Sequence, residues 1–186
     1  MEDLLKYLDS LYPLSSSLRD RLTTILKAKD LKKKDFLLKE GRINDKIFFI
    51  KSGLLRCYYQ KDDQEVSSWF MKEGDIIISV ESFFTQQPSH ENIQAIEPSQ
   101  LYFIHQHELQ TLYKTYLEFN FIGRVLTEKY YVLSEQRLVN LRSRRADERY
   151  QYLLKHHPVF IQRVPSKYLA SYLGVSEVYL SRIKGH

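Results

Sequence analysis

Cysteine is nearly absent from this chain of 186 residues, in which Cys57 is the only one. A single cysteine excludes a disulfide within the chain and also a metal or iron–sulfur site built from several thiolates. Cys57 alternates with Leu55 and Tyr59 in a pattern typical of a strand, so we expect a small buried hydrophobic side chain rather than a redox sensor. Apolar runs are short as well, and none approaches the length of a membrane span.

Signals for export, metal binding and catalysis are also missing. The N-terminal sequence MEDLLKYLDS lacks the basic and apolar regions of a signal peptide, so we expect a cytoplasmic protein. His105 and His107 have the spacing of one strand face, but no third ligand is near, so we expect loop histidines and no metal. No nucleophile motif, phosphate-binding loop or ligand cluster is visible, and we therefore expect no enzyme.

Aromatic residues are abundant, and positive charge is concentrated in one half. Fourteen Tyr, ten Phe and 43% hydrophobic residues indicate a folded chain, which is long enough for one good core and a smaller second one. Residues 1–106 hold 15 Lys/Arg and 16 Asp/Glu, whereas residues 107–186 hold 13 and 7. The positive excess of the second half suits the neutralisation of phosphates, although a solvated helical face would look the same.

The hydrophobic period changes twice along the chain. Residues 1–30 have helical spacing, with Pro13 between two short helices. Short strands rich in β-branched and aromatic residues follow, separated by Gly, Pro and Asp-Asp turns; we place them at 36–38, 46–53, 54–60, 65–70, 75–78, 91–96 and 101–104. This spacing favours a sandwich, jelly roll or barrel. After His107 the helical period returns, and no proline occurs before Pro158. The fold class is therefore α+β.

One face of the long helical stretch has near-heptad spacing. Its residues are Ile122, Leu126, Lys129, Tyr130, Leu133, Arg137 and Leu141. The stretch is long enough for a two-stranded dimer contact, and we expect the first five of these residues in a dimer interface. Packing of the same face on the chain's own barrel is the alternative, and the two are compatible if they apply to different stretches of the helix. The charged segment 140–150 is the expected hinge, and Asp147 is the expected cap of the next helix.

The last twenty-two residues, PSKYLASYLGVSEVYLSRIKGH, have the pattern of a helix-turn-helix. Leu169, Ala170 and Leu173 share one face of a first helix, Gly174 provides a left-handed turn, and Ser176 can cap a second helix. The second helix would present Glu177, Val178, Ser181 and Arg182 outward, where such motifs enter the major groove. An ordinary helical hairpin is the alternative. The small Ala170, the Leu-Gly-Val-Ser turn and the charged outer side favour DNA binding.

A β-roll, a long helix and a C-terminal helix-turn-helix, in this order, resemble the Crp/Fnr family of bacterial transcription regulators. The resemblance depends on FFIKSGLLRCYYQ around Gly53, on Gly74-Asp75 before an apolar strand, and on LASYLGVSEVYLSRI. The short members common in Bacteroidetes, with a motif like RVPSKYLASYLGVS, look most similar. The resemblance implies a double-stranded β-helix (jelly roll) domain over 1–116, a dimerisation helix over 117–143, and a DNA-binding domain over 144–186.

In that family the β-roll clamps the phosphate of a cyclic nucleotide with a Gly-Glu pair and an Arg-Ser/Thr pair. The matching positions here are Ile78-Ser79 and Ser89-His90, so both the glutamate and the arginine are missing. Glu81 as a displaced carboxylate and His90 as a weak substitute for the cation are the candidates, and neither matches the family's pattern. Because an arginine–phosphate contact is strong, we expect that cyclic AMP is not the effector. The roll either binds another small molecule between Ile76 and Ala95 or serves only as a platform for dimerisation.

The resemblance also implies roles in DNA binding, as a homodimer on an inverted repeat, with RNA polymerase as a further partner. Arg182 matches the family's base-reading arginine and suits guanine, Glu177 suits a cytosine amino group or the helix dipole, and Val178 suits a thymine methyl. The expected phosphate contacts are Ser166, Lys167, Tyr179, Ser181 and Lys184. The chain stops soon after Lys184, so we expect the family's wing to be short or absent. A β-roll module that has lost DNA binding is the alternative function.

Overall fold

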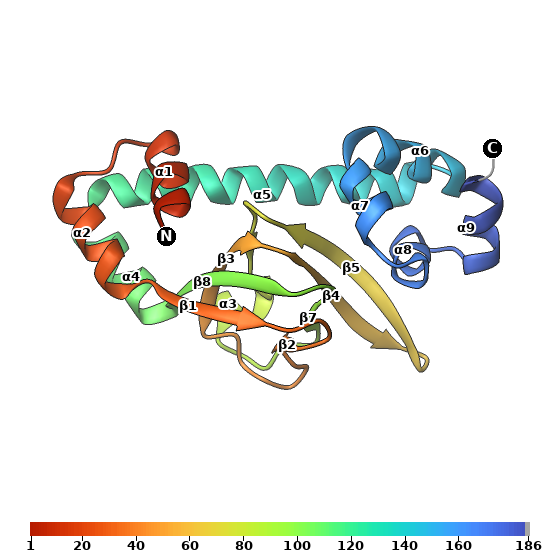
Figure 1. Ribbon diagram of the computed structural model, residues 1–186, viewed down its shortest axis with the longest axis horizontal. Coiled ribbons are helices and arrows are strands. Elements are labelled where there is room, and N and C mark those ends of the chain that lie inside the picture. Colours follow the sequence, from red (N-terminus) through yellow and green to blue (C-terminus); the bar gives the residue numbers. More distant parts are fainter. Residues whose placement is uncertain (185–186) are drawn as a thin grey trace.

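The computed structural model of the chain describes residues 1–184 (Figure 1). The predicted short or absent wing concerns residues 185–186, which lie outside the described residues. Two short helices come first, α1 (Glu2–Leu11) and α2 (Ser16–Ile25), with Pro13 between them as predicted. Ser15 caps α2, because its side chain accepts a hydrogen bond from the backbone of Leu18. Across the described range, every helix is too short or too polar to traverse a bilayer.

An antiparallel β-sandwich follows, as the strand pattern predicted. One sheet has the order β1 (Lys27–Leu31), β8 (Ser99–His105), β3 (Lys46–Ser52) and β6 (Ile76–Ile77). The other has the order β2 (Phe36–Leu38), β7 (Asn92–Ala95), β4 (Leu54–Lys61) and β5 (Gln64–Lys72). Between the sheets, Ile50, Leu55, Ile93 and Leu101 are almost completely buried, as is the thiol-bearing Cys57. Burial raises the pKa of that thiol well above its usual value, in line with its packing as a small core side chain.

Gly53, between β3 and β4, is a position that only glycine can occupy. Its φ angle is +105°, and an added Cβ would lie 2.7 Å from the backbone Cα of Ser99. Both the conformation and the close approach of another strand exclude a side chain. The tight connection lets β3 and β4 enter opposite sheets, and it explains why this glycine is one of the residues that carry the family resemblance.

Some local assignments from the sequence were wrong. Strand β1 was assigned to a helix because four of its five residues are exposed, so it shows no alternation of apolar and polar positions. A short helix, α3 (Val80–Thr85), was missed after β6, and β6 is shorter than predicted. A second short helix, α7 (Pro158–Arg163), was also missed; Pro158 is its first residue, a position that tolerates proline.

Helices α4 (Gln106–Thr115) and α5 (Leu117–Ser143) follow the sandwich, and α5 runs along its whole length (Figure 1). The face predicted for dimer contact turns inward. Ile122 is fully buried and Leu126 packs in the core below α1 and α2, while the hydroxyl of Tyr130 accepts a hydrogen bond from the backbone of Ile76 at 2.6 Å. The alternative interpretation, packing on the chain's own barrel, therefore describes this face.

The other two predicted dimer residues also contact their own chain. The Lys129 amine lies 3.2 Å from the Tyr7 hydroxyl of α1, and Leu133 lines a cavity against β5. Only Ile122 of the five is fully buried, whereas Leu126, Tyr130 and Leu133 are partly buried and Lys129 is exposed. The first turns of this face pack on the chain's own core, and a dimer contact by the later ones stays a prediction.

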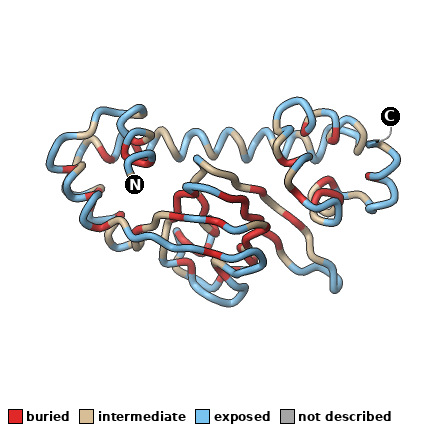
Figure 2. The backbone as a smooth tube through the Cα atoms, in the orientation of Figure 1, coloured by how far each residue is buried: buried red, intermediate tan, exposed pale blue. Residues whose placement is uncertain are grey.

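Four helices complete the described chain: α6 (Ala146–His156), α7, α8 (Ser166–Leu173) and α9 (Glu177–Lys184). Arg145, and not Asp147, occupies the cap position of α6, and Asp147 lies within its first turn. Figure 2 shows buried residues in the sandwich and again among these helices, whereas the middle of α5 is mostly exposed. The second core includes Leu54, Phe70 and Ile96 from the sandwich, so the C-terminal helices share their interior with it.

Candidate functional site

The turn between α8 and α9 has the geometry that its sequence predicts. Gly174 adopts a left-handed conformation with φ of +66°, and Val175 donates a backbone hydrogen bond to the carbonyl of Ala170 at 3.0 Å. This closure is the usual way to end a helix at glycine. The Ser176 hydroxyl then accepts from the backbone of Tyr179 at 3.2 Å, so the predicted cap at the start of α9 is confirmed.

The two helices divide their side chains between a buried and an exposed side. Leu169, Ala170, Leu173 and Leu180 are at most 2% exposed. The residues predicted to point outward, Glu177, Val178, Ser181 and Arg182, are all exposed, and Val178 retains 65% of its accessible surface. Arg182 forms neither a hydrogen bond nor an ion pair with any described residue, so its guanidinium is available to a ligand.

The residues predicted to contact phosphate lie near the same surface. Ser166, Lys167, Tyr179 and Lys184 are exposed, and the Lys184 amine donates to the Ser166 hydroxyl at 3.1 Å. This contact brings the end of α9 next to the beginning of α8. A positive group therefore lies beside the first turn of α8, where backbone N–H groups are unsatisfied.

Arg149 has a structural role that the sequence analysis missed. Its guanidinium donates to the carbonyl of Leu173 through Nε at 3.1 Å and Nη2 at 2.7 Å, and to the carbonyl of Arg144 through Nη1 at 2.8 Å. An arginine at the C-terminal end of a helix satisfies free carbonyls and complements the helix dipole. Arg149 thus stabilises the turn before α9 by hydrogen bonds to the end of α8. From the sequence, the charged segment around it looked like a solvated helical face.

The C-terminal helices are attached to strand β5 and its neighbours. The Ser171 hydroxyl of α8 accepts from the backbone of Ser67 and donates to the carbonyl of Glu65, both at 2.8 Å. Phe70 packs against Phe160 and Tyr172, with ring centres 5.7 and 5.1 Å apart. These contacts hold α8 against the edge of the sandwich.

Two arginines strengthen this attachment. Arg163 of α7 forms hydrogen-bonded ion pairs with Glu73 and Glu97, and its hydrogen bonds lower the pKa of Glu73 below the usual value. Arg56 of β4, whose side chain is only 2% exposed, lies with its guanidinium 3.5 Å from the ring centre of Tyr168 in α8. Neither residue was predicted, because both depend on partners distant in sequence.

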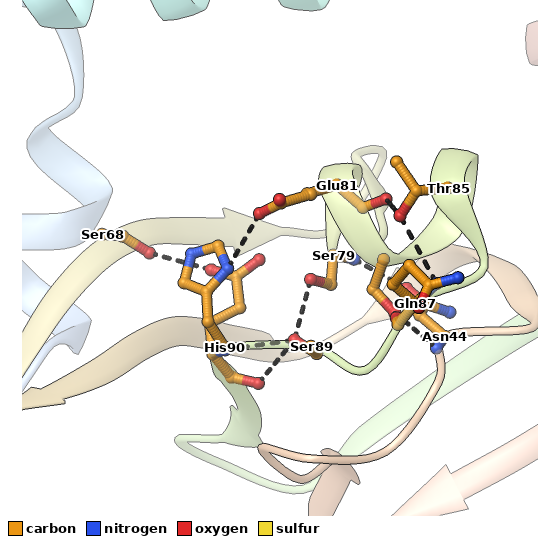
Figure 3. A network of polar contacts seen from close by, with 10 residues as sticks. Asn44, Ser68, Ser79, Glu81, Thr85, Gln87, Ser89 and His90 are labelled. Atoms are coloured by element: carbon orange, nitrogen blue, oxygen red, sulfur yellow. Dashed lines mark hydrogen bonds and ion pairs between the residues drawn. The ribbon is translucent and has the colours of Figure 1, made fainter.

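The second predicted site, in the β-roll, is closed by hydrogen bonds among its own side chains (Figure 3). The hydroxyls of Ser79 and Ser89 lie 2.9 Å apart, and both residues are buried. Ser89 also bonds the backbone N–H and the carbonyl of Glu91, at 3.1 and 2.9 Å. The Asn44 side chain accepts from the backbone of Ser79 at 2.7 Å.

Two carboxylates differ in their relation to this serine pair: Glu91 adjoins it, and Glu81 does not. Glu81 and His90 form an exposed pair with an N–O distance of 3.1 Å, so these two predicted residues do meet, but outside the buried cluster. Ile78 is partly buried against the core below α5. Glu91 was not singled out from the sequence, although it shares a strand face with Ile93 and Ala95. Burial raises the pKa of the Glu91 carboxyl, against hydrogen bonds from Ser79 and Ser68 that lower it.

Metal binding finds no support in the side-chain arrangement. Within residues 1–184, no group of three or more His, Cys, Asp or Glu side chains is placed to share an ion. His105 ends β8 and His107 belongs to α4. The prediction that both lie in loops was therefore wrong. Their rings stack at 5.4 Å, and His105 lies 3.4 Å from Asp45.

Comparison with known proteins first defines the class of the sandwich. Residues 28–116 match the sequence model of the cyclic nucleotide-binding domain. No curated protein matches the chain in sequence.

The whole described fold then agrees with that of Crp/Fnr regulators. CLP of Xanthomonas campestris, described as a c-di-GMP-responsive global regulator, has a TM-score of 0.70 and 17% identity over 92% of this chain and 90% of its own. For FixK2 of Bradyrhizobium japonicum the TM-score is 0.70 and the identity 17%, over 87% of this chain and 83% of its own. For a putative Crp/Fnr regulator from Eubacterium rectale the TM-score is 0.74 and the identity 15%, over 96% of this chain and 85% of its own. The family resemblance noted in the sequence is thus confirmed at the level of fold.

Proposed function

We propose that the chain is a sequence-specific DNA-binding transcription regulator of the Crp/Fnr type, which binds an inverted repeat as a homodimer. The observation that carries this proposal is the exposed side of α9. Glu177, Val178, Ser181 and Arg182 project from a helix whose opposite side is anchored by the fully buried Leu180. A short helix fixed from behind, with an unpaired arginine in front, suits insertion into a major groove.

Charge supports the same proposal. The segment from residue 107 onward carries 13 Lys/Arg against 7 Asp/Glu, and Lys184 and Ser166 lie together beside the exposed side of α9. Lysines at this position would neutralise phosphates and fix the register of the helix on the duplex.

A homodimer is supported by the outer face of α5, opposite the face that was predicted. Val132 and Val139 are 52% and 56% exposed, and Tyr131 and Leu138 are 66% and 40% exposed. Each pair is separated by seven residues, the spacing of a coiled-coil seam. An apolar stripe of this kind on an exposed helix favours pairing with a second copy.

The dimer is tested by placing charge in the stripe. Val132→Glu with Val139→Glu should convert the protein to a monomer in sedimentation experiments. Thr23→Glu with Thr24→Glu, at exposed polar positions of α2, adds the same two charges away from the stripe and is the control that should stay dimeric. A double stripe variant that remains dimeric would show that the seam lies elsewhere.

We also propose that cyclic AMP does not bind the β-roll. The partly buried Glu91 carboxylate lies beside the serine pair, and the position at which the family has an arginine holds Ser89. A phosphate would lose a charge-assisted contact, worth roughly 1.5–3 kcal/mol, and would face a carboxylate instead. Calorimetric titration should show no binding of cyclic AMP; measurable binding would contradict this part of the proposal.

DNA binding is tested by selecting bound duplexes from a random pool at low salt and measuring their affinity at several salt concentrations. The expected result is an enriched inverted repeat, with half-sites about one helical turn apart and an affinity that falls steeply with salt. Absence of binding at low salt would overturn the proposal. It would favour the alternative, a β-roll module that has lost DNA binding.

A further inference from the structure

A cavity of about 260 Å³ lies where the sandwich, the long helix and the C-terminal helices meet. Figure 1 shows the arrangement: α5 crosses above the sandwich, and strand β5 slopes beneath it toward α8. The walls include Trp69 of β5, Tyr130 of α5, Tyr152 of α6 and Tyr172 of α8. The volume is slightly below the roughly 300–1,000 Å³ of typical ligand pockets, so it suits a molecule with one ring and a short polar group.

Arg137 of α5 supplies a cation whose hydrogen bonding is incomplete. Its Nε is buried and has no hydrogen-bond partner among residues 1–184. The guanidinium lies 5.5 Å from the ring centre of Trp69 and 5.3 Å from that of Tyr172. In the same described range, no carboxylate forms an ion pair with it. Arg137 is partly buried, and its charge also lowers the pKa of the Glu91 carboxyl. The buried Nε–H stays unsatisfied among the described residues, which is costly unless a ligand completes it.

The other charged groups of the cavity are already engaged. Arg149 donates to the carbonyls of Leu173 and Arg144, and the Lys72 amine donates to the carbonyl of Glu73 at 3.3 Å. Asp75, the carboxylate in the wall, accepts from the backbone of Lys72 at 3.0 Å. Arg137 is therefore the group that selects the charge of a ligand, and it selects an anion.

We propose that this cavity binds a small aromatic carboxylate. The carboxylate would bond the Arg137 guanidinium, which presents paired donors suited to two carboxylate oxygens. The ring would lie among Trp69, Tyr130 and Tyr172, where aromatic pairs are favourable. This site is separate from the serine pair of the β-roll, and it includes a residue of α8. An effect of the ligand on DNA would depend on the proposed function, but binding itself does not.

The protein contains its own reporter, because Trp69 is the only tryptophan of the chain and lies in the wall of the cavity. The test is a titration of intrinsic fluorescence, without DNA, using benzoate, 4-hydroxybenzoate and phenylacetate. Their neutral amides are the matched probes. At least one carboxylate should change the Trp69 emission saturably, and its amide should bind about tenfold more weakly or less.

Variants at Arg137 distinguish the contact with the carboxylate from nonspecific binding of the aromatic ring. Arg137→Met should weaken binding of the carboxylate about tenfold or more and leave binding of the amide unchanged. Arg124→Met, at a mostly exposed arginine of the same helix, is the control and should bind normally. Should Arg137→Met fail to fold, Arg137→Lys keeps the charge, and the comparison of acid with amide on the unaltered protein still decides.

Three results would overturn the proposal. These are equal affinity for a carboxylate and its amide, unchanged affinity in the folded Arg137→Met variant, and no saturable change in emission with any of the three carboxylates. None of them bears on DNA binding, which is measured separately, so a failure of this inference can be distinguished from a failure of the proposed function.

Discussion

The serine pair of the β-roll and the exposed side of α9 differ in how their polar groups are satisfied. Ser79 and Ser89 are buried, and their hydroxyls bond to each other, with Ser89 also bonded to the adjacent backbone. Arg182 is exposed and has no partner within residues 1–184. A site that completes its own hydrogen bonds contributes to stability, whereas a site that leaves them open can bind something else.

In the β-roll, the fold matches the family more closely than the residues of the phosphate site do. The sandwich matches the cyclic nucleotide-binding domain over residues 28–116, yet the position that the family fills with an arginine holds Ser89. At this position Ser79, Ser89 and Asn44 bond to one another's hydroxyls and to the local backbone.

The largest expected effect concerns the support of α9. Leu180→Ala should lower the free energy of unfolding by about 2–5 kcal/mol, because Leu180 is fully buried and a cavity would remain. Val178→Ala, two residues earlier on the same helix and 65% exposed, should change the free energy of unfolding by less than about 0.5 kcal/mol. Urea denaturation followed by circular dichroism measures both, and equal effects would show that α9 is not anchored on this side.

Arg182→Ala should affect DNA binding and not stability. We expect a loss of about 1–3 kcal/mol in affinity for the selected duplex and relaxed base preference at one position of each half-site. The unfolding transition should stay unchanged, because the side chain is exposed. Arg124→Ala on α5 is the matched control. Unaltered discrimination between duplexes in a competition assay would argue against base reading by Arg182.

Ser89→Ala should show the reverse behaviour. Removal of the buried hydroxyl leaves the Ser79 hydroxyl and the backbone N–H of Glu91 without their partner, at a cost of about 1–2 kcal/mol in unfolding free energy. DNA affinity of the folded variant should be unchanged. Ser181→Ala, at an exposed position of α9, should leave stability nearly unaltered. A stable Ser89→Ala protein would mean that the serine pair is not structural.

The smallest expected effect is the pH dependence of Glu91. Burial raises the pKa of this carboxyl above the usual 4.5, so the folded chain binds the proton more tightly than the unfolded chain. The ionised side chain therefore opposes folding, to an extent that is absent below about pH 4.5 and grows as the pH rises through the folded pKa. Glu91→Gln should raise the melting temperature slightly at pH 7 and not at pH 4. A lower melting temperature at pH 7 would contradict this sign.

Local sequence was sufficient for the turn before α9 and insufficient for the partner of α5. Gly174 and Ser176 act through bonds to residues a few positions away, so their roles follow from short patterns. The face of α5 that contains Ile122 and Tyr130 was found from its period. The period does not say whether a second copy or the sandwich covers it, and the outer pair Val132 and Val139 has heptad spacing too.

The missed residues share a dependence on distant contacts. Arg56 meets Tyr168, and Arg137 lies between Trp69 and Tyr172, across more than thirty residues in each case. No spacing rule links such positions. Glu91 is different, because the alternation with Ile93 and Ala95 placed its carboxylate on the inward face and was visible in the sequence.

The bonds of Ser171 have a consequence for how far the C-terminal helices can travel. Strand β5 is the outermost strand of its sheet, and the Ser171 hydroxyl occupies the backbone groups of Glu65 and Ser67 on that open margin. Unpaired strand margins recruit strands from other molecules. A large movement of α8 would expose these backbone groups to strands of other molecules, so we expect α8, and α9 with it, to move only slightly.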